Sequence, residues 1–319
     1  MSYPHLFKKS LCVAFMSGAV SCHGAIFGDG DQANGIEDGR VMAPAHLLNA
    51  VGTIFCDGRL RGTGTHIDVA DAVDKYLPSN KKLPLNKTPR SKQREPSNKT
   101  PRSKQKAPSI IVTAAHVLFN RTTGLPFTDC SYRPGNKRLS AIPFDQVSSH
   151  AYQPLAKDKM RQSETDIVFV SLQHKIYRKG LPLALQVNPH GLQLLAYNPG
   201  AGRIDTSGDC KSYESANFGS KDLLLHNCDA ESGASGGPLL EMINNKPLAV
   251  ALGSVVAIHG GTFSEAVEST DGAPSSYFDM ASGAKAQPEK WINQARRVDR
   301  ELLQRLQDFV AYLSKGSAN

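Results

Sequence analysis

The chain has 319 residues, of which 40% are apolar and 7% aromatic. These values describe an ordinary soluble globular protein and exclude one that is of low complexity throughout. The formal net charge is +8, but the tract from Ser79 to Lys106 alone contains ten Lys or Arg and one acid. The basic balance therefore belongs to one segment, which excludes a uniformly basic domain.

The N-terminus has the parts of a secretory signal peptide, which we place at residues 1–25. Two lysines precede the largely apolar stretch 11–20, and small residues follow it. The apolar stretch is shorter than the roughly 20 residues that a membrane-spanning helix needs, so no stable membrane span is expected. Residues up to Cys22 imperfectly resemble a bacterial lipoprotein processing site, but Ala19 replaces the usual leucine. Simple cleavage and a secreted or periplasmic location are favoured.

After this leader, short runs of β-forming residues recur from Asn49 to Met280, separated by Gly, Pro, Asn and Asp. This pattern predicts an all-β region. Towards the C-terminus, apolar residues recur at mostly helical spacing with charges between them, from Ile292 to Leu313. A C-terminal amphipathic α-helix over 286–315 is therefore expected, packed on the second half of the β region.

The β region is interrupted by the basic tract, in which NKTPRSKQ occurs at 86–93 and again at 98–105. We expect a disordered insertion over 79–107, because such a tract cannot bury enough apolar surface to offset the entropy cost of ordering it. A loop tolerates the added length, since its closure entropy grows only logarithmically. A solvated loop is favoured over weak contact with an anionic polymer or a cell surface, because no aromatic residue interleaves the charges.

Two motifs carry the chemistry. VTAAH ends at His116, and GASGGP places Ser235 between glycines. A serine hydroxyl needs an imidazole to take its proton, and that imidazole needs a carboxylate to fix its tautomer. The glycines let the backbone turn sharply and aim the amides of Gly233 and Ser235 at a developing oxyanion. The sequence therefore predicts acyl transfer with Ser235 as nucleophile and His116 as base.

Asp166 is the best candidate for the acid, because it directly precedes the β-forming run IVFVSL, whereas the other aspartates between His116 and Ser235 lie in polar or turn-like contexts. The order is then His, Asp, Ser. GASGG also fits the elbow of an α/β-hydrolase, but that fold needs an acid and then a histidine after the serine. Only His259 follows Ser235, with no Asp between them. The subtilisin order is rejected as well, because no acid upstream of His116 begins such a strand.

These motifs resemble those of the trypsin-like (chymotrypsin-fold) serine endopeptidases, especially their bacterial secreted, glutamyl-endopeptidase-like branch. The resemblance rests on TAAH, DIVFVSL and GASGGPLL and extends over about 51–280. The segments GTGT, Cys228-Asp229 and IHGG add local matches. It implies two packed six-stranded antiparallel β-barrels, the N-terminal one at 41–180 with His116 and Asp166 and the C-terminal one at 181–285 with Ser235.

Four cysteines remain once the leader is removed, an even number that suits an oxidising compartment. Cys210 and Cys228 are the preferred disulfide pair, because their bond would staple a short hairpin just before the nucleophile loop. Cys56 and Cys130 then pair by elimination. No Cys/His spacing indicates zinc, so neither a metal nor a cofactor is expected.

The resemblance leaves two opposed substrate preferences. Asp229 occupies the position at which trypsin relatives place the carboxylate that receives Arg or Lys. The same Cys-Asp pair resembles glutamyl endopeptidases, in which a histidine matching His259 meets an acidic side chain. The basic tract offers many Arg and Lys sites for self-cleavage but a single glutamate, Glu95. This favours an acidic or undefined preference.

The sequence thus predicts a secreted serine endopeptidase that cleaves polypeptide substrates through an acyl-enzyme intermediate. A catalytically silent secreted binding protein of the same fold is disfavoured, because the full set of candidate site residues is present. An esterase acting on small acyl substrates shares the chemistry and stays open. Ser254 is a further candidate site residue, either as a hydrogen-bond partner of Asp166 or as an ordinary strand serine.

Overall fold

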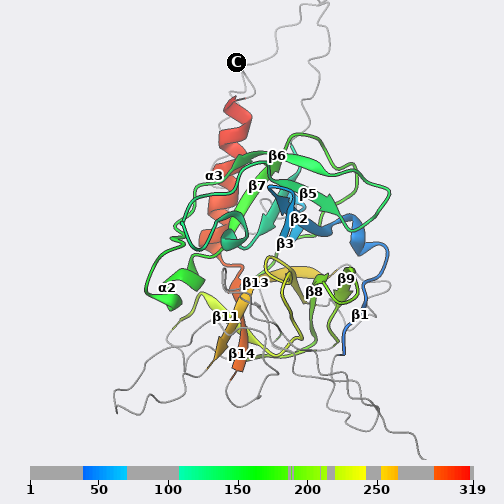
Figure 1. The fold of residues 1–319 in the computed structure, drawn as a ribbon, viewed down its shortest axis with the longest axis vertical. Coiled ribbons are helices and arrows are strands. Elements are labelled where there is room, and N and C mark those ends of the chain that lie inside the picture. Colours follow the sequence, from blue (N-terminus) through cyan, green and yellow to red (C-terminus); the bar gives the residue numbers. More distant parts are fainter. Residues whose placement is uncertain are drawn as a thin grey trace, which may run out of the picture.

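The structure is a computed structural model that describes residues 39–69, 108–185, 188, 190–208, 210–213, 220–241, 253–264 and 291–316. The signal peptide expected at 1–25, the lipoprotein alternative at Cys22 and the basic insertion expected at 79–107 lie outside these residues. In the described part of the chain, two β units and a C-terminal helix pack against one another (Figure 1).

The first unit is a closed antiparallel barrel of six strands in the order β2-β3-β4-β7-β6-β5. The strands are β2 (Val51–Cys56), β3 (Arg59–His66), β4 (Ile110–Thr113), β5 (Ser131–Pro134), β6 (Ile142–Val147) and β7 (Val168–Leu172). The all-β class and the six-stranded barrel that the resemblance implied are confirmed.

Strand β7 shows why a continuous apolar run forms a strand here. Successive side chains of a strand point to opposite faces. Val168 and Val170 lie in the barrel interior with Ile54 and Tyr132. Phe169 instead faces a second core that the barrel shares with the other unit. Both faces of β7 are therefore buried, which accounts for the absence of polar alternation.

The second unit is a curled antiparallel sheet in the order β1-β9-β8-β12-β13-β14-β11-β10. Its strands are β1 (Val41–Met42), β8 (Leu192–Asn198), β9 (Arg203–Thr206), β10 (Ser212–Tyr213), β11 (Leu223–His226), β12 (Pro238–Glu241), β13 (Ser254–Ser264) and β14 (Trp291–Arg297). Where a second six-stranded barrel was expected, the described residues form this eight-stranded half-barrel. Strand β1 falls within the range expected for the first barrel, yet it belongs here because Val41 pairs with Thr206.

Four helical segments complete the described chain: the 3-10 helices η1 (Leu47–Asn49) and η2 (Ala115–Leu118), and the α-helices α2 (Lys159–Glu164) and α3 (Arg300–Gly316). None of them is long and apolar enough to cross a membrane. The helix expected over 286–315 starts later, because residues 291–297 form strand β14 between β13 and β11. Asp299 marks the true start, since its carboxylate accepts a hydrogen bond of 2.8 Å from the Leu302 amide as an N-cap.

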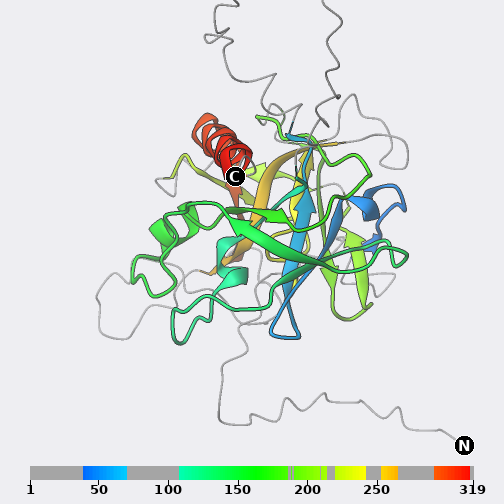
Figure 2. The same ribbon diagram turned by 90° about the horizontal axis from the view of Figure 1, so that it is seen from above.

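One apolar core joins both β units and α3. It contains Val51, Ile110, Val112, Ile167 and Phe169 of the barrel, Leu195, Leu240, Val255 and Ile258 of the sheet, and Val298, Leu302, Leu303, Leu306, Phe309 and Leu313 of the C-terminal segment. Figures 1 and 2 show α3 standing beside the barrel, although the strand that leads into it lies in the sheet. The helix therefore packs across the boundary between the units.

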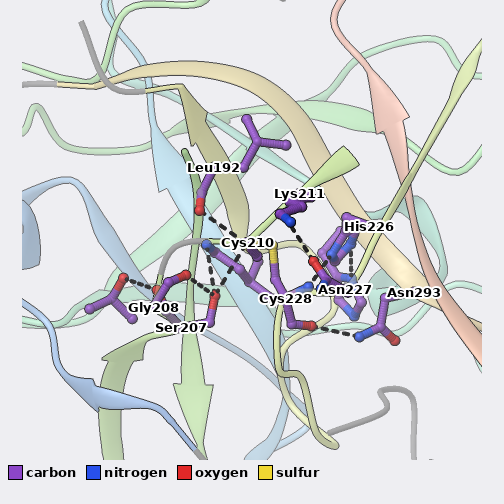
Figure 3. The surroundings of a disulfide bond; sticks show 12 residues. Leu192, Ser207, Gly208, Cys210, Lys211, His226, Asn227, Cys228 and Asn293 are labelled. Atoms are coloured by element: carbon purple, nitrogen blue, oxygen red, sulfur yellow. Dashed lines mark hydrogen bonds between the residues drawn. A yellow bond between two sulfur atoms is a disulfide. The ribbon is translucent and has the colours of Figure 1, made fainter. Parts of the chain in front are cut away.

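Two disulfides link Cys56 with Cys130 and Cys210 with Cys228, the pairs named above. The first joins β2 to the segment before β5 in the barrel. The second ties the segment before β10 to the segment after β11 (Figure 3). Cys228 opens the stretch that leads to Ser235, so this disulfide braces the approach to the nucleophile loop.

Replacing Leu306 by alanine should lower the free energy of unfolding by about 2 to 5 kcal/mol, because the residue is fully buried in the shared core. Tyr312 is the control on the same helix, being 61% exposed. Its alanine variant should stay within about 0.5 kcal/mol of wild type. Urea unfolding with the disulfides intact measures both, and equal losses would show that α3 is not docked.

Candidate active site

His116 and Asp166 meet where strand β4 ends and its paired strand β7 begins. His116 lies in η2, just after β4, and Asp166 lies between α2 and β7. Thr113 of β4 pairs with Val168 of β7, which brings the two flanking segments together. The Asp166 carboxylate accepts two hydrogen bonds from His116, one of 2.6 Å from Nδ1 and one of 2.8 Å from the backbone amide. One residue thus orients both the ring and the backbone of the other.

The His116 ring is buried and set up to accept a proton. With Nδ1–H donating to the carboxylate, the neutral ring carries its basic lone pair on Nε2. Burial lowers the pKa of His116 below its ordinary value, and the charge of Asp166 offsets only part of this effect. Arg121 lowers the pKa of His116 further. The imidazole is therefore neutral at neutral pH, the form that a general base requires.

The loop around Ser235 is held in a sharp turn by its glycines. Gly233 has φ of +96° and Gly236 has φ of +88°, conformations that side-chain-bearing residues rarely adopt. The Gly236 amide donates to the carbonyl of His259 at 2.8 Å, and the His259 amide donates to the carbonyl of Gly237 at 2.9 Å. Among the described residues, neither the Gly233 nor the Ser235 amide donates a hydrogen bond. Both amides are thus available to an oxyanion.

This loop packs directly on the histidine segment of the barrel. A Cβ added to Gly236 would lie 2.2 Å from Thr113 Oγ1 and 3.1 Å from the Ala114 nitrogen, two residues before His116. Only glycine permits so close an approach. Ser235 itself is 1% exposed, and its Oγ forms no hydrogen bond with any described residue. The structure thus brings the two loops together, with the Ser235 hydroxyl not bonded to the imidazole.

Thr63 is a site residue whose role sequence reasoning missed. Its amide donates to the carbonyl of Ser235 at 2.8 Å, and its hydroxyl donates to the carbonyl of Gly233 at 2.7 Å. The same hydroxyl accepts a bond of 3.0 Å from the Tyr197 amide. Thr63 lies inside the GTGT segment, so a local signal existed, but its partners are far away in sequence.

The two candidate substrate-binding residues have different surroundings. Asp229 is buried, and its carboxylate accepts a hydrogen bond of 3.1 Å from the Gly39 amide. His259 is also buried, and its Nδ1 lies 3.2 Å from Nε2 of His226. His226 ends β11 and was not singled out from the sequence. The structure therefore pairs His259 with a second imidazole and Asp229 with backbone.

A buried polar network supports the strands around these histidines. The Cys228 amide lies 3.3 Å from Nδ1 of His226, and the Cys228 carbonyl accepts a bond of 2.7 Å from Nδ2 of Asn293 (Figure 3). Thr262 donates to the side-chain oxygen of Asn293. Ser254 begins β13 opposite Glu241 and forms no hydrogen bond with Asp166. No group of three or more acidic, His or Cys side chains among the described residues is arranged to hold a metal.

No protein-family model matches the chain, and no curated protein matches its sequence. Solved structures do match its fold. A Glu endopeptidase has 15% identity and a TM-score of 0.50 over 86% of this chain and 97% of its own. The thermostable serine protease AL20 from an extremophilic microorganism has 10% identity and a TM-score of 0.49 over 83% and 99%. Neuropsin, a serine protease expressed in the limbic system of mouse brain, has 13% identity and a TM-score of 0.46 over 87% and 98%.

The likeness to the Glu endopeptidase extends over both β units, and its low identity makes it evidence about fold alone. It agrees with the closed six-stranded barrel, the curled second sheet and the C-terminal helix. The chain therefore has the chymotrypsin-like fold of the trypsin-like serine proteases.

Proposed function

We propose that this protein is a serine endopeptidase with Ser235 as nucleophile, His116 as general base and Asp166 as the acid that orients it. The observation that carries the proposal is the buried His116–Asp166 pair, with a bond of 2.6 Å, together with the packing of the glycine-rich Ser235 loop on the segment that leads to His116. Nucleophile, base and orienting acid are the three parts that acyl transfer requires. The two disulfides suit a secreted protein.

The proposed reaction has two halves. In the first, Ser235 Oγ attacks the peptide carbonyl while its proton passes to His116 Nε2, and Asp166 stabilises the resulting imidazolium. The amides of Gly233 and Ser235 bind the oxyanion, a contribution worth about two to three orders of magnitude in rate. His116 then gives the proton to the departing amine as the C–N bond breaks. In the second half, a water molecule repeats these steps on the acyl-enzyme and releases the acid product.

Replacing Ser235 by alanine should lower kcat/KM for peptide cleavage by about a million-fold, because the nucleophile is lost. The mature chain and the variant are incubated with a mixed peptide library, and the cuts are read by mass spectrometry. Ser140→Ala, at an exposed serine, is the matched control and should cut like wild type. Wild-type labelling of Ser235 without peptide cleavage would favour an esterase, and neither activity would favour a binding protein.

Activity should fall on the acid side with a midpoint below the ordinary histidine pKa of about 6.5. The reason is that burial lowers the pKa of His116, so the imidazole stays neutral until the pH drops through that lowered pKa. The dependence of kcat/KM on pH measures the midpoint in the free enzyme. A midpoint above the ordinary value would contradict the burial of the base.

The contacts of Asp229 weigh against a preference for Arg or Lys. Its carboxylate is buried and already accepts a hydrogen bond from the Gly39 amide. A trypsin-type pocket needs a carboxylate directed at the substrate, because the cationic side chain otherwise loses its water without gaining a partner. We therefore assign Asp229 to holding the segment before β1 against the approach to the nucleophile loop.

The His226–His259 pair supports a preference for an acidic side chain in the substrate. The Cys228 amide donates to Nδ1 of His226, so the proton of neutral His226 lies on Nε2 and points to Nδ1 of His259. By the same rule, the proton of His259 lies on its Nε2. Burial and the neighbouring His259 hold the pKa of His226 well below its ordinary value, so its ring stays neutral. The hydrogen bond therefore runs from His226 Nε2 to His259 Nδ1. An N–H donor at this histidine is what the resemblance to glutamyl endopeptidases implies for meeting an acidic side chain.

We expect peptides to be cut after Glu or Asp, and this preference to depend on His259. In His259→Gln, kcat/KM for a Glu substrate should fall by about ten- to a hundred-fold, the value of one or two charge-assisted hydrogen bonds. Its rate on a matched Gln substrate should change much less. Asp229→Asn should keep the preference. Cleavage after Arg that disappears in Asp229→Asn would reverse the assignment.

A further inference from the structure

We propose that Arg296 and Arg305 are positioning residues for Asp166, holding the backbone on either side of it from the C-terminal segment. This inference rests on the proposed function, because it assigns the acid its role in the reaction. Arg296 lies in β14 and Arg305 in α3, so both belong to elements that follow every other strand in sequence. Neither touches the reacting groups directly.

Arg296 binds the carbonyl two residues before the acid. Its Nε donates to the carbonyl of Glu164 at 2.7 Å. Glu164 is the last residue of α2, and the final carbonyls of a helix have no partner within the helix. Arg296 is 4% exposed, and its Nη1 donates to the carboxylate of Asp299, at 2.7 Å, and to the carbonyl of Asp222, at 3.2 Å. A buried cation held at both ends has little freedom to move.

Arg305 binds the carbonyl just after the acid. Its Nη2 donates to the carbonyl of Ile167 at 3.4 Å and to that of Ser149 at 3.1 Å. Arg305 is partly buried, and both burial and the nearby charge of Arg296 lower its pKa. Bringing two like charges together costs energy, which the carbonyl bonds on both sides of the acid offset. The segment 164–167 is therefore clamped at both ends.

The contacts of Arg296 and Arg305 with segment 164–167, which we call the arginine clamp, also connect the acid to the nucleophile loop. The strand registers place Arg296 opposite Ile258 of β13, and Ile258 opposite Pro238 of β12. Pro238 directly follows the loop that carries Ser235. A single row across three strands thus joins the backbone around Asp166 to the nucleophile loop, although the acid belongs to the barrel and the serine to the sheet.

Small displacements of the acid have large effects on this chemistry. The bond from His116 Nδ1 to Asp166 is 2.6 Å long, and a shift of about 1 Å in a catalytic group can cost about a hundred-fold in rate. Asp166 also raises the pKa of His116 against the effect of burial. Among the described residues, Arg121 and Tyr152 are titratable groups that interact electrostatically with this pair, and no variant below changes them.

The test compares Arg296→Met, Arg305→Met and Arg305→Lys with Arg300→Met, in the mature protein. Arg300 is an exposed arginine in the first turn of α3 that forms no hydrogen bond with described residues. Each variant is assayed for kcat and KM on the best peptide, for the acid side of its pH profile, and for the downfield proton signal of the His116–Asp166 bond. Thermal unfolding reports the fold, and Asp166→Asn shows how the proton signal changes when the acid is lost.

We expect both methionine variants to lose about ten- to a hundred-fold in kcat, with KM within about two-fold. The acid midpoint should move to lower pH, and the proton signal should shift or weaken. Lysine should rescue position 305, where one donor nitrogen makes both bonds, and Arg300→Met should match wild type. If Arg296→Met does not fold, the less buried position 305 decides.

A folded Arg305→Met with unchanged kcat, midpoint and proton signal would overturn the inference, while wild type still cuts peptides. A wild type that cuts nothing would instead contradict the proposed function. In that case a proton signal altered in Arg305→Met but not in Arg300→Met would still support the positioning of Asp166 by the arginine clamp.

Discussion

Thr63 makes the interaction on which the site depends most. The proposed chemistry needs groups from two separate β units, and this buried residue of the barrel bonds to the carbonyls on both sides of Ala234 in the other unit. Its own carbonyl accepts a bond of 2.8 Å from the Thr113 hydroxyl, in the segment that leads to His116. One residue thus holds the nucleophile loop and the histidine segment in register. Losing a buried bond of this kind leaves unpaired polar groups as well as a gap.

The shared apolar core stabilises the packing of the two β units, which a single hydrogen bond cannot do alone. Barrel, sheet and α3 all contribute to it, so the two halves of the site are fixed by burial over a wide area and oriented by a few polar contacts. This division suits catalysis, because apolar contacts are nondirectional whereas hydrogen bonds have preferred geometry. The buried His226–His259 pair and the bonds of Asn293 follow the same pattern within the sheet.

Local sequence predicts the parts of this protein that depend on neighbours along the chain. The glycines around Ser235 and the strand after Asp166 are of that kind, and the fold class follows from many such segments. The predicted helix start was wrong because apolar residues at helical spacing extend back to Ile292, which is a strand residue, whereas the N-cap is Asp299. Thr63 and His226 act on partners 170 and 33 residues away. No local pattern contains that information.

The place of β14 and α3 in the chain has a consequence for biosynthesis. Both follow all the strands on which they pack, so they leave the ribosome after every other part of the shared core. Domains form their final packing only when all their parts are present. The core around Ile167, next to Asp166, therefore stays incomplete while earlier strands are already exposed. Under the proposed function, the candidate site is therefore incomplete until the last segments of the shared core have been made.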